Sequence, residues 1–373
     1  MEGAAVSLPE DIIFDVLSRL PVKPLCRFRC VSKEWRALIS GEAFVAAQKS
    51  RAASLLVGVF SSSSRCTDEH KLELRVMDMD GSVLRVFKDV VTTLLLPTRL
   101  DLVCVYGIRG GATIIDPAAG RVSTVGKHNP NTPMRIWHYS FGRETPSGAY
   151  KLLRIQKSFN DDHGQLCEIA MIDDSGAEPT WRQRPAPPFV TDRYSGRKAT
   201  VIGTLYFMAH TSGGRRESWN RIAAFDLKSE EWTETINGPP MGQCKDGTIA
   251  LAEFKATLNM VQTVRTPAYD DGHGLCTNIW ALIDSKKSIW IKQYTIEIPR
   301  NLFLHRVLDV LSDGRILLLN SFWKQEKNVF SHRSALRYII QFYNPSTKAV
   351  TDIMEMAEEF GVTMSFYTGS LLS

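Results

Sequence analysis

The sequence predicts a small all-α unit of three helices at the N-terminus, followed by an all-β propeller of about six blades. Residues 8–48 carry apolar side chains at helical spacing. From about residue 53 the pattern changes to short alternating or β-branched runs broken by Gly, Pro, Asn and Asp. A hairpin-like form then recurs at regular intervals. We therefore divide the chain into residues 1–50 and 51–373.

Three helices are expected in the first unit. Ser7 followed by Glu10 forms a possible capping box, and Pro9 suits a first turn, where a missing N–H costs little. The run "PVKP" (21–24) ends this helix and starts a second one, because Pro24 is tolerated only near a helix start. Ser32 can cap a third helix. The apolar positions of the first helix are Ile12, Ile13, Val16, Leu17 and Leu20, and those of the third are Trp35, Leu38 and Ile39.

The helical unit has more apolar surface than it can bury alone. Three helices in about forty residues lie near the lower size limit of a stable domain. Apolar residues also stand at the chain reversals, where they face outward as easily as inward: Leu8, Pro9, Leu20, Pro21, Val22 and Leu25. We expect part of this surface to bind a partner. The alternative is a small helical cap that packs on the rest of the chain.

Five stretches share one form, an apolar strand, an Asp or Asn, a short polar turn and a second strand. They span residues 112–125, 168–183, 222–234, 279–292 and 339–353, with turn residues Asp116, Asp174, Asp226, Asp284 and Asn344 at intervals of 58, 52, 58 and 60. Such side chains accept hydrogen bonds from turn backbone. Four strands in each ~50–60 residues is the repeat of a propeller blade. The alternative is an irregular pair of β-sandwiches.

Composition narrows the class of protein. Net charge is +5, from 45 basic and 40 acidic residues mixed along the chain, which gives no argument for nucleic acid. Seven scattered cysteines without a C-x-x-C pair favour a reducing compartment. Neither a signal peptide nor an apolar run of the ~20 residues that a membrane helix needs is visible. We expect a soluble protein of the cytoplasm, the nucleus or both, with no membrane association.

The motifs of enzymes and metal sites are missing. The sequence has no G-x-S-x-G, no P-loop and no H-E-x-x-H. Residues 160–167 and 269–276 each combine two acids, a His and a Cys, yet both occupy the same place in the repeat, where hairpin turns need Asp and Gly. We therefore predict no catalytic residue, no metal and no cofactor.

The stretch "LPEDIIFDVLSRLPVKPLCRFRCVSKEWRALI" (8–39) closely resembles the F-box, with its leading Leu-Pro, acidic first turn and final Trp. The rest of the chain is similar to the kelch-like F-box-associated propeller of the large plant F-box families. The stretches that carry this likeness are "HYSFGRETPSGAYKLLRI" (138–155), "AAFDLKSEEW" (223–232) and "SFYTGSLLS" (365–373).

This resemblance implies a non-catalytic substrate receptor of a Skp-cullin-F-box ubiquitin ligase, which brings target proteins for ubiquitination and proteasomal degradation. The F-box would bind a Skp-family adaptor and, through it, cullin and RING subunits; the propeller would hold an unknown protein substrate. Basic residues such as Arg27, Arg29 and Lys33 would suit an acidic partner. The adaptor-facing set would be Leu8, Pro9, Ile13, Leu17, Leu20, Pro21, Val22, Leu25, Cys30, Val31 and Trp35.

Two other functions stay open. The chain could be a Skp-bound scaffold without ligase activity, or its propeller could sense a small ligand or glycan. Substrate contacts are expected in two long loops, 127–139 and 210–221, because Arg and Trp most often anchor interfaces. Their candidate residues are Arg135, Trp137, His138, Arg215, Arg216 and Trp219. The alternative for both loops is solvated surface without a ligand.

Overall fold

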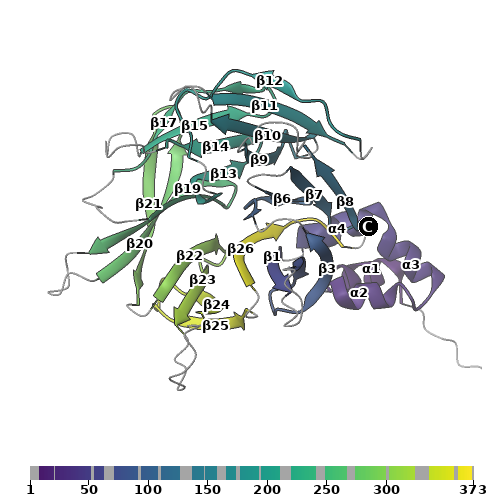
Figure 1. Ribbon diagram of the computed structural model, residues 1–373. Helices are drawn as coiled ribbons and strands as arrows, with labels where there is room; N and C mark the ends of the chain where they lie inside the picture. Colours follow the sequence, from purple (N-terminus) through teal and green to yellow (C-terminus); the bar gives the residue numbers. More distant parts are fainter. Residues whose placement is uncertain are drawn as a thin grey trace, which may run out of the picture.

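The computed structural model describes most of the chain. The described residues are 8–20, 22–51, 54–62, 71–90, 94–107, 111–126, 137–146, 148–157, 165–173, 177–192, 195–210, 220–240, 248–266, 274–299, 302–323, 336–356 and 360–371. They form helices at the N-terminus and six β-sheets arranged in a ring (Figure 1). The predicted fold class is thereby confirmed.

The described residues of the helical unit form four helices, one more than predicted. They are α1 (Glu10–Ser18), α2 (Val22–Phe28), α3 (Lys33–Ser40) and α4 (Glu42–Arg51). The expected third helix is interrupted at Gly41, whose backbone is extended with φ −68° and ψ 140°. Residues 42–51, "EAFVAAQKSR", are mostly good helix formers and continue as a separate helix. The prediction of three helices was wrong at this break.

Residues that favour helix starts lie at the first three helices, as the sequence predicted. Pro9 directly precedes α1, and Pro24 lies in the first turn of α2. Ser32 caps α3, since its hydroxyl oxygen accepts a hydrogen bond from the Trp35 backbone N–H at 3.1 Å. Ser7, the other predicted cap, lies outside the described residues.

The helices share a core with the first blade of the propeller. Inside the helical unit Phe14 packs edge-on against Phe44, with ring centroids 5.2 Å apart. The same apolar cluster continues through Val57 of the propeller and reaches Leu371 near the C-terminus. In addition, the Ser370 hydroxyl donates to the buried side-chain oxygen of Gln48 on α4 at 3.4 Å. The helical unit is therefore fixed to the ring rather than only tethered to it.

Each blade is one sheet, and its strands are antiparallel except for β5 in blade 1. Blade 1 contains β1 (Leu55–Ser62), β2 (Lys71–Met77), β3 (Val83–Val90) and β26 (Phe360–Tyr367), with β5 (Arg99–Leu100) parallel to β26. Blade 2 contains β4 (Leu94–Leu95), β6 (Val103–Tyr106), β7 (Ala112–Asp116) and β8 (Arg121–Val125). Blade 3 contains β9 (Trp137–Arg143), β10 (Tyr150–Lys157), β11 (Gln165–Ile172) and β12 (Arg182–Arg184).

The remaining three blades follow in chain order. Blade 4 contains β13 (Lys198–Val201), β14 (Thr204–Met208), β15 (Arg221–Asp226), β16 (Glu231–Trp232) and β17 (Ile236–Asn237), after the short 3₁₀ helix Ser195–Arg197. Blade 5 contains β18 (Thr248–Phe254), β19 (Thr257–Thr266), β20 (Gly274–Asp284) and β21 (Ile289–Ile298). Blade 6 contains β22 (Leu302–Val310), β23 (Ile316–Trp323), β24 (Leu336–Tyr343) and β25 (Val350–Glu355).

The predicted hairpins are confirmed at four of the five turn positions. Asp116 Oδ1 accepts hydrogen bonds from the backbone N–H groups of the two residues at 118 and 119, each at 3.0 Å. Asp226, Asp284 and Asn344 accept equivalent bonds from their own turns. Asp174 lies outside the described residues. An Asx turn thus joins the third strand of these blades to the fourth.

The last strand of the chain closes the ring inside the first blade. β26 pairs antiparallel with β1, from Leu55 opposite Tyr367 to Phe60 opposite Phe360. Ser365 on β26 also reaches the segment that leads into β5, since its buried hydroxyl donates to the Thr98 carbonyl oxygen at 2.7 Å. The first and last strands of the propeller, β1 and β26, are therefore held in one sheet.

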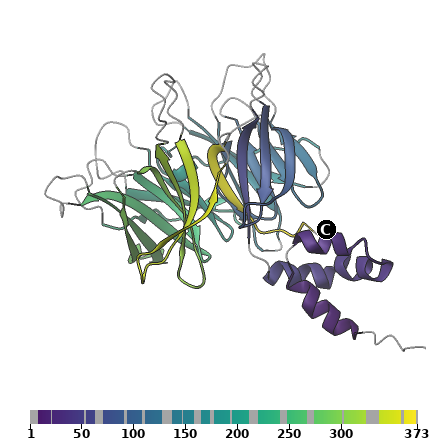
Figure 2. The same cartoon turned by 90° about the horizontal axis from the view of Figure 1, so that it is seen from below.

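The ring has two different rims. β1 starts directly after α4, so we call that side the helical rim; Figure 2 shows the helices below it. The ends of β9, β13 and β26 surround one pocket on this side. Because neighbouring strands are antiparallel, the Asx turns also lie at the helical rim. The start of β9 and the ends of β14 and β15 that flank residues 211–219 lie at the opposite, distal rim.

We predict that Ser365→Ala weakens ring closure. The substitution leaves the buried Thr98 carbonyl without this donor, which costs about 1–2 kcal/mol of the free energy of unfolding. Urea denaturation measures the change. The matched control is Ser346→Ala, since that exposed turn serine should change stability by less than about 0.5 kcal/mol. Equal stability of Ser365→Ala and wild type would contradict the assigned role.

Candidate protein-interaction surfaces

Helix α1 carries apolar side chains on two faces. Ile13, Phe14 and Leu17 point inward and join the core that the helices share with blade 1. Ile12 and Val16, four residues apart and therefore on one face, are 49% and 55% exposed. A helix that buried all of its apolar residues in its own domain would have a polar outer face. The outer side of α1 therefore remains uncovered by the described part of the chain.

The predicted adaptor-facing residues divide by burial. Leu8 and Val31 are 62% and 63% exposed, and Pro9 and Cys30 are exposed as well. Ile13, Leu20 and Trp35 are half-buried against the shared core, where Trp35 packs edge-on against Phe28. Leu17 and Leu25 are buried and hold the helices together. Pro21 and the side chain of Val22 lie outside the described residues.

Ile12 and Val16 were missing from the predicted set. Both belong to the helical pattern that the sequence shows, but that pattern does not say which of its apolar rows faces the core. An i, i+4 row of β-branched residues beside a second apolar row was the available signal. We define the α1 patch as Leu8, Ile12, Val16 and Val31, the exposed large apolar residues of the helical unit.

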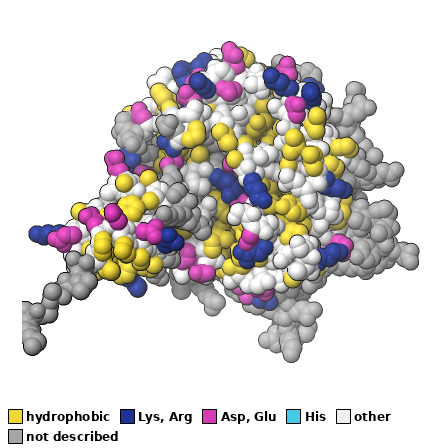
Figure 3. All heavy atoms as spheres, turned by 180° about the vertical axis from the view of Figure 1, so that it is seen from behind, with side chains coloured by type: hydrophobic (Ala, Val, Ile, Leu, Met, Phe, Trp, Pro, Cys, Tyr) yellow, Lys and Arg dark blue, Asp and Glu magenta, His cyan; other side chains and the backbone are white. Residues whose placement is uncertain are grey.

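Charged side chains surround the helical unit. Arg27 and Lys33 are exposed, and Arg19 forms an exposed ion pair with Asp15 at 2.8 Å. Figure 3 shows hydrophobic side chains gathered on the outer surface of the helical part, with charged residues beside them. An apolar centre with a charged rim is the usual composition of a protein interface.

Most predicted substrate-contacting residues lie outside the described part of the chain. This applies to Arg135, Arg215, Arg216 and Trp219, and to the side chain of Trp137, whose backbone starts β9 opposite Gln156. His138 is the next residue of β9 and is half-buried. The strand ends that flank both loops lie at the distal rim. The sequence could not indicate that these strand ends share one rim.

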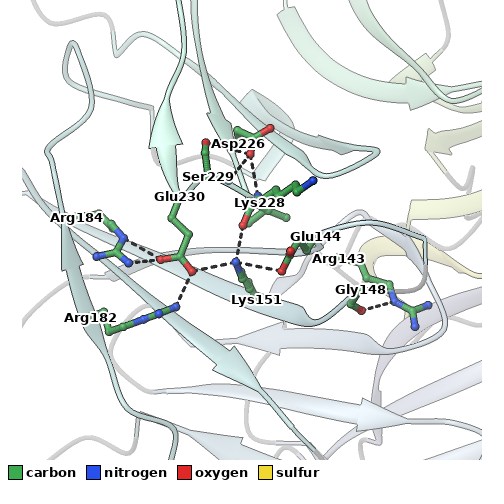
Figure 4. A network of polar contacts seen from close by, with 11 residues as sticks. Arg143, Glu144, Gly148, Lys151, Arg182, Arg184, Asp226, Lys228, Ser229 and Glu230 are labelled. Carbon is green, nitrogen blue, oxygen red and sulfur yellow. Dashed lines mark hydrogen bonds and ion pairs between the residues drawn. The ribbon is translucent and has the colours of Figure 1, made fainter.

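A network of charges joins blades 3 and 4 (Figure 4). Glu230, in the turn between β15 and β16, is 7% exposed. Its Oε1 lies 2.9 Å from Lys151 Nζ and 2.5 Å from Arg182 Nη2, and its Oε2 accepts a hydrogen bond from Arg184 Nε at 2.9 Å. Lys151 also contacts Glu144 at 3.3 Å. Both oxygens of the Glu230 carboxylate are therefore paired with cations of blade 3, and the network holds blades 3 and 4 together.

Glu230 occupies an unfavourable backbone conformation, with φ at 58°. Non-glycine residues rarely adopt this left-handed region. Gly120, Ser288 and Lys348 adopt it at the same position of their own turns, with φ values of 73°, 53° and 57°, so the conformation belongs to the turn. Burial would raise the pKa of Glu230, but hydrogen bonds from Lys151 and Arg184 outweigh burial and keep the pKa below its ordinary value.

Arg99 lies across the centre of the ring. Its Nε donates to the Glu253 carbonyl oxygen of blade 5 at 3.2 Å, and its Nη2 lies 2.7 Å from Asp309 Oδ1 of blade 6. The guanidinium also stacks on the Phe366 ring of blade 1, 4.3 Å from the ring centroid. One side chain thus connects three blades at the channel. Burial, opposed by Arg99 and assisted by Asp309, raises the pKa of the Glu253 carboxyl to about 7.

The described residues contain no group of three or more His, Cys, Asp or Glu placed to hold a metal ion. The two acidic stretches with His lie mainly outside this part; their cysteines, Cys167 and Cys276, are buried. Among the described helices, none has both the length and the apolar character needed to cross a membrane.

Helices fused to a six-bladed propeller define the class of protein, and comparison with known families identifies it. Residues 6–45 match the F-box domain, and residues 44–362 match the F-box associated beta propeller domain. The chain therefore belongs to the F-box proteins that carry an F-box-associated β-propeller. This confirms the resemblance given by residues 8–39 and by the propeller stretches.

Several Arabidopsis thaliana proteins are similar along most of their length. F-box protein At2g21930 is 22% identical, covering 94% of this chain and 87% of its own. F-box protein At1g30790 is 26% identical, covering 78% and 75%. F-box/kelch-repeat protein At2g43445 is 21% identical, covering 82% and 69%. Among solved structures, hydrazine synthase from Kuenenia stuttgartiensis is 12% identical, covering 70% of this chain and 67% of its own, with a TM-score of 0.33.

We predict that Glu230→Gln destabilises the protein at neutral pH by about 3 kcal/mol, because the variant removes the counter-charge of the buried Lys151 and of the two partly exposed arginines, Arg182 and Arg184. The pKa of Glu230 is lowered in the folded state, so its contribution is present above the ordinary value of 4.5 and is lost as pH falls below it. The melting temperature of wild type should therefore approach that of the variant in acid.

The control for this prediction is Glu297→Gln, which removes an exposed pair with Lys348 at 3.2 Å and should change stability by less than about 1 kcal/mol. Thermal unfolding at several pH values measures both variants. A constant difference between wild type and Glu230→Gln at all pH values would contradict the assigned charge contacts.

Proposed function

We propose that the protein is the substrate-recognition subunit of a Skp-cullin-F-box ubiquitin ligase. In this role it binds a Skp-family adaptor through its helices, reaches cullin and RING subunits through that adaptor, and brings target proteins for ubiquitination and degradation. The subunit itself is non-catalytic. The proposal implies that the protein works in the cytoplasm or the nucleus, where such ligases assemble.

The α1 patch carries this proposal. In an F-box domain, whose family binds Skp-type adaptors, Leu8, Ile12, Val16 and Val31 form exposed apolar surface that no described part of the chain covers. Apolar side chains at the centre of an interface supply most of its binding energy, and the surrounding charges of Arg27 and Lys33 guide the encounter. The inward-facing members of the predicted set, Leu17 and Leu25, belong to the core that holds the helices together.

The two rims suit a receptor. An adaptor bound to α1 would lie at the helical rim, while the connections proposed to contact a target leave from the distal rim. The shared core and the Gln48–Ser370 contact keep the helical unit at a fixed position on the ring. A rigid connection of this kind holds a bound target at a defined distance from the ubiquitin-loaded enzyme, and proximity then accelerates transfer.

We predict that Ile12→Asp combined with Val16→Asp weakens adaptor binding at least about 100-fold, because two buried apolar contacts are replaced by desolvated charges. Co-expression with a Skp-family adaptor and size-exclusion chromatography measure complex formation. The control is Ile283→Asp combined with Ile291→Asp, because both residues lie on blade 5 and are 58% and 52% exposed.

Loss of co-elution in the α1 variant alone would support the proposal. Failure of the wild-type protein to bind the adaptor would exclude the proposal. Cullin in a pull-down of the wild-type complex distinguishes a ligase subunit from a Skp-bound scaffold, since only the ligase subunit would retain cullin.

A further inference from the structure

A cavity of about 110 Å³ lies in the central channel of the propeller. Inner strands of blades 4, 5, 6 and 1 line it, together with the segment before β5. Arg99 and Glu253 line this cavity and also the pocket at the helical rim. They therefore lie between the cavity and that pocket. From them the cavity extends to Thr248, the first residue of β18, and hence toward the distal rim.

Arg306 lines this cavity from an otherwise apolar sheet face. On β22 it pairs with Leu319 of β23, which in turn pairs with Ile340 of β24. Directly paired residues share one face of a sheet. Leu319 and Ile340 belong to the buried cluster that packs blade 6 against Phe366 of blade 1. The guanidinium of Arg306 therefore enters the channel from an apolar interface.

Arg306 is half-buried, and its side chain has no hydrogen bond, ion pair or ring contact with any described residue. Burial lowers its pKa, and no acidic group opposes that effect. By contrast, Arg99 is paired with Asp309 at 2.7 Å. An arginine cannot escape burial by losing its proton, so an unpaired one is expensive unless a counter-charge is present.

The other charges at the cavity do not supply that counter-charge. Asp309 already neutralises Arg99, and the Glu253 carboxyl, whose pKa is raised to about 7, is in part uncharged near neutral pH. The cluster of two arginines and two acids thus keeps an excess of positive charge. The contacts of Arg99 use Nε and Nη2, so the N–H groups of its Nη1 remain as further donors.

We propose that the central channel binds a small oxyanion, a carboxylate or a phosphate, with Arg306 as its main anchor and Arg99 Nη1 as a second donor. A guanidinium fork matches the two oxygens of either group. The cavity volume sets the size, because drug-sized ligands occupy about 300–1,000 Å³, and about 110 Å³ admits phosphate or a short dicarboxylate but not a nucleotide.

This site is independent of the proposed adaptor surface. Strands of blades 4, 5, 6 and 1 line it, whereas the α1 patch belongs to the helical unit. Loss of anion binding should therefore leave adaptor binding intact, and loss of adaptor binding should leave anion binding intact. An acidic side chain of a target protein offers the same oxyanion chemistry. Titration with a free ion, in the absence of a target, tests whether the channel takes anions that are not part of a protein.

The experiment is calorimetric titration of the full-length protein with inorganic phosphate and with malonate, at constant ionic strength set with chloride. We expect saturable binding of at least one of them to wild type and a loss of at least 10-fold in affinity in Arg306→Met. The control Arg315→Met removes an exposed arginine that pairs with Asp313 at 2.7 Å, and it should bind as wild type does.

Melting temperatures in the same series give a second measurement. Bound anion should raise the melting temperature of wild type with a saturating dependence on concentration, while general salting effects should raise wild type and Arg306→Met equally. Equal rises in both proteins, or no binding of either anion to wild type, would overturn the proposal.

If Arg306→Met does not fold, Arg306→Lys is the alternative variant for the binding measurement. It keeps the charge but removes the planar fork, so the affinity should fall at least 10-fold. Unchanged affinity in this variant would also contradict the assignment.

Discussion

The pairing of β26 with β1 is the constraint on which the rest of the structure depends. It closes six sheets into a ring and thereby creates the channel that Arg99 crosses. It also carries the chain past Tyr367 to Ser370 and Leu371, which contact the helical unit. The same strand therefore sets the ring, the position of the helices and the separation between the helical and distal rims.

Local sequence signals predicted the elements, because each depends on a few neighbouring residues. Asp116 and Asp226 marked their hairpins since an Asx side chain satisfies its own turn, and Ser32 marked the start of α3. The fourth helix was missed because, within residues 8–48, no break was predicted after the helix capped by Ser32, whereas the extended backbone at Gly41 divides the chain there. Ring closure involves strands about 300 residues apart, so no local pattern could reveal it.

The interaction surfaces were predicted less completely, because burial is a property of the assembled fold. Helical spacing could not separate the inward row with Leu17 from the outward row with Ile12 and Val16. Similarly, the sequence gives Arg306 no special place, and its unpaired position follows only from the apolar face on which β22 lies. Strand directions were also needed to show that the strand ends flanking the two long loops share one rim.

The central claim is that α1 binds an adaptor at the helical rim while the distal rim stays free for a target. Amide hydrogen exchange of the full-length protein, alone and with a Skp-family adaptor, tests it most directly. On adaptor binding we expect slower amide exchange in residues 10–18 and around Val31. Exchange at the starts of β9 and β15 should stay unchanged. Protection at those strand starts, with none in α1, would contradict it.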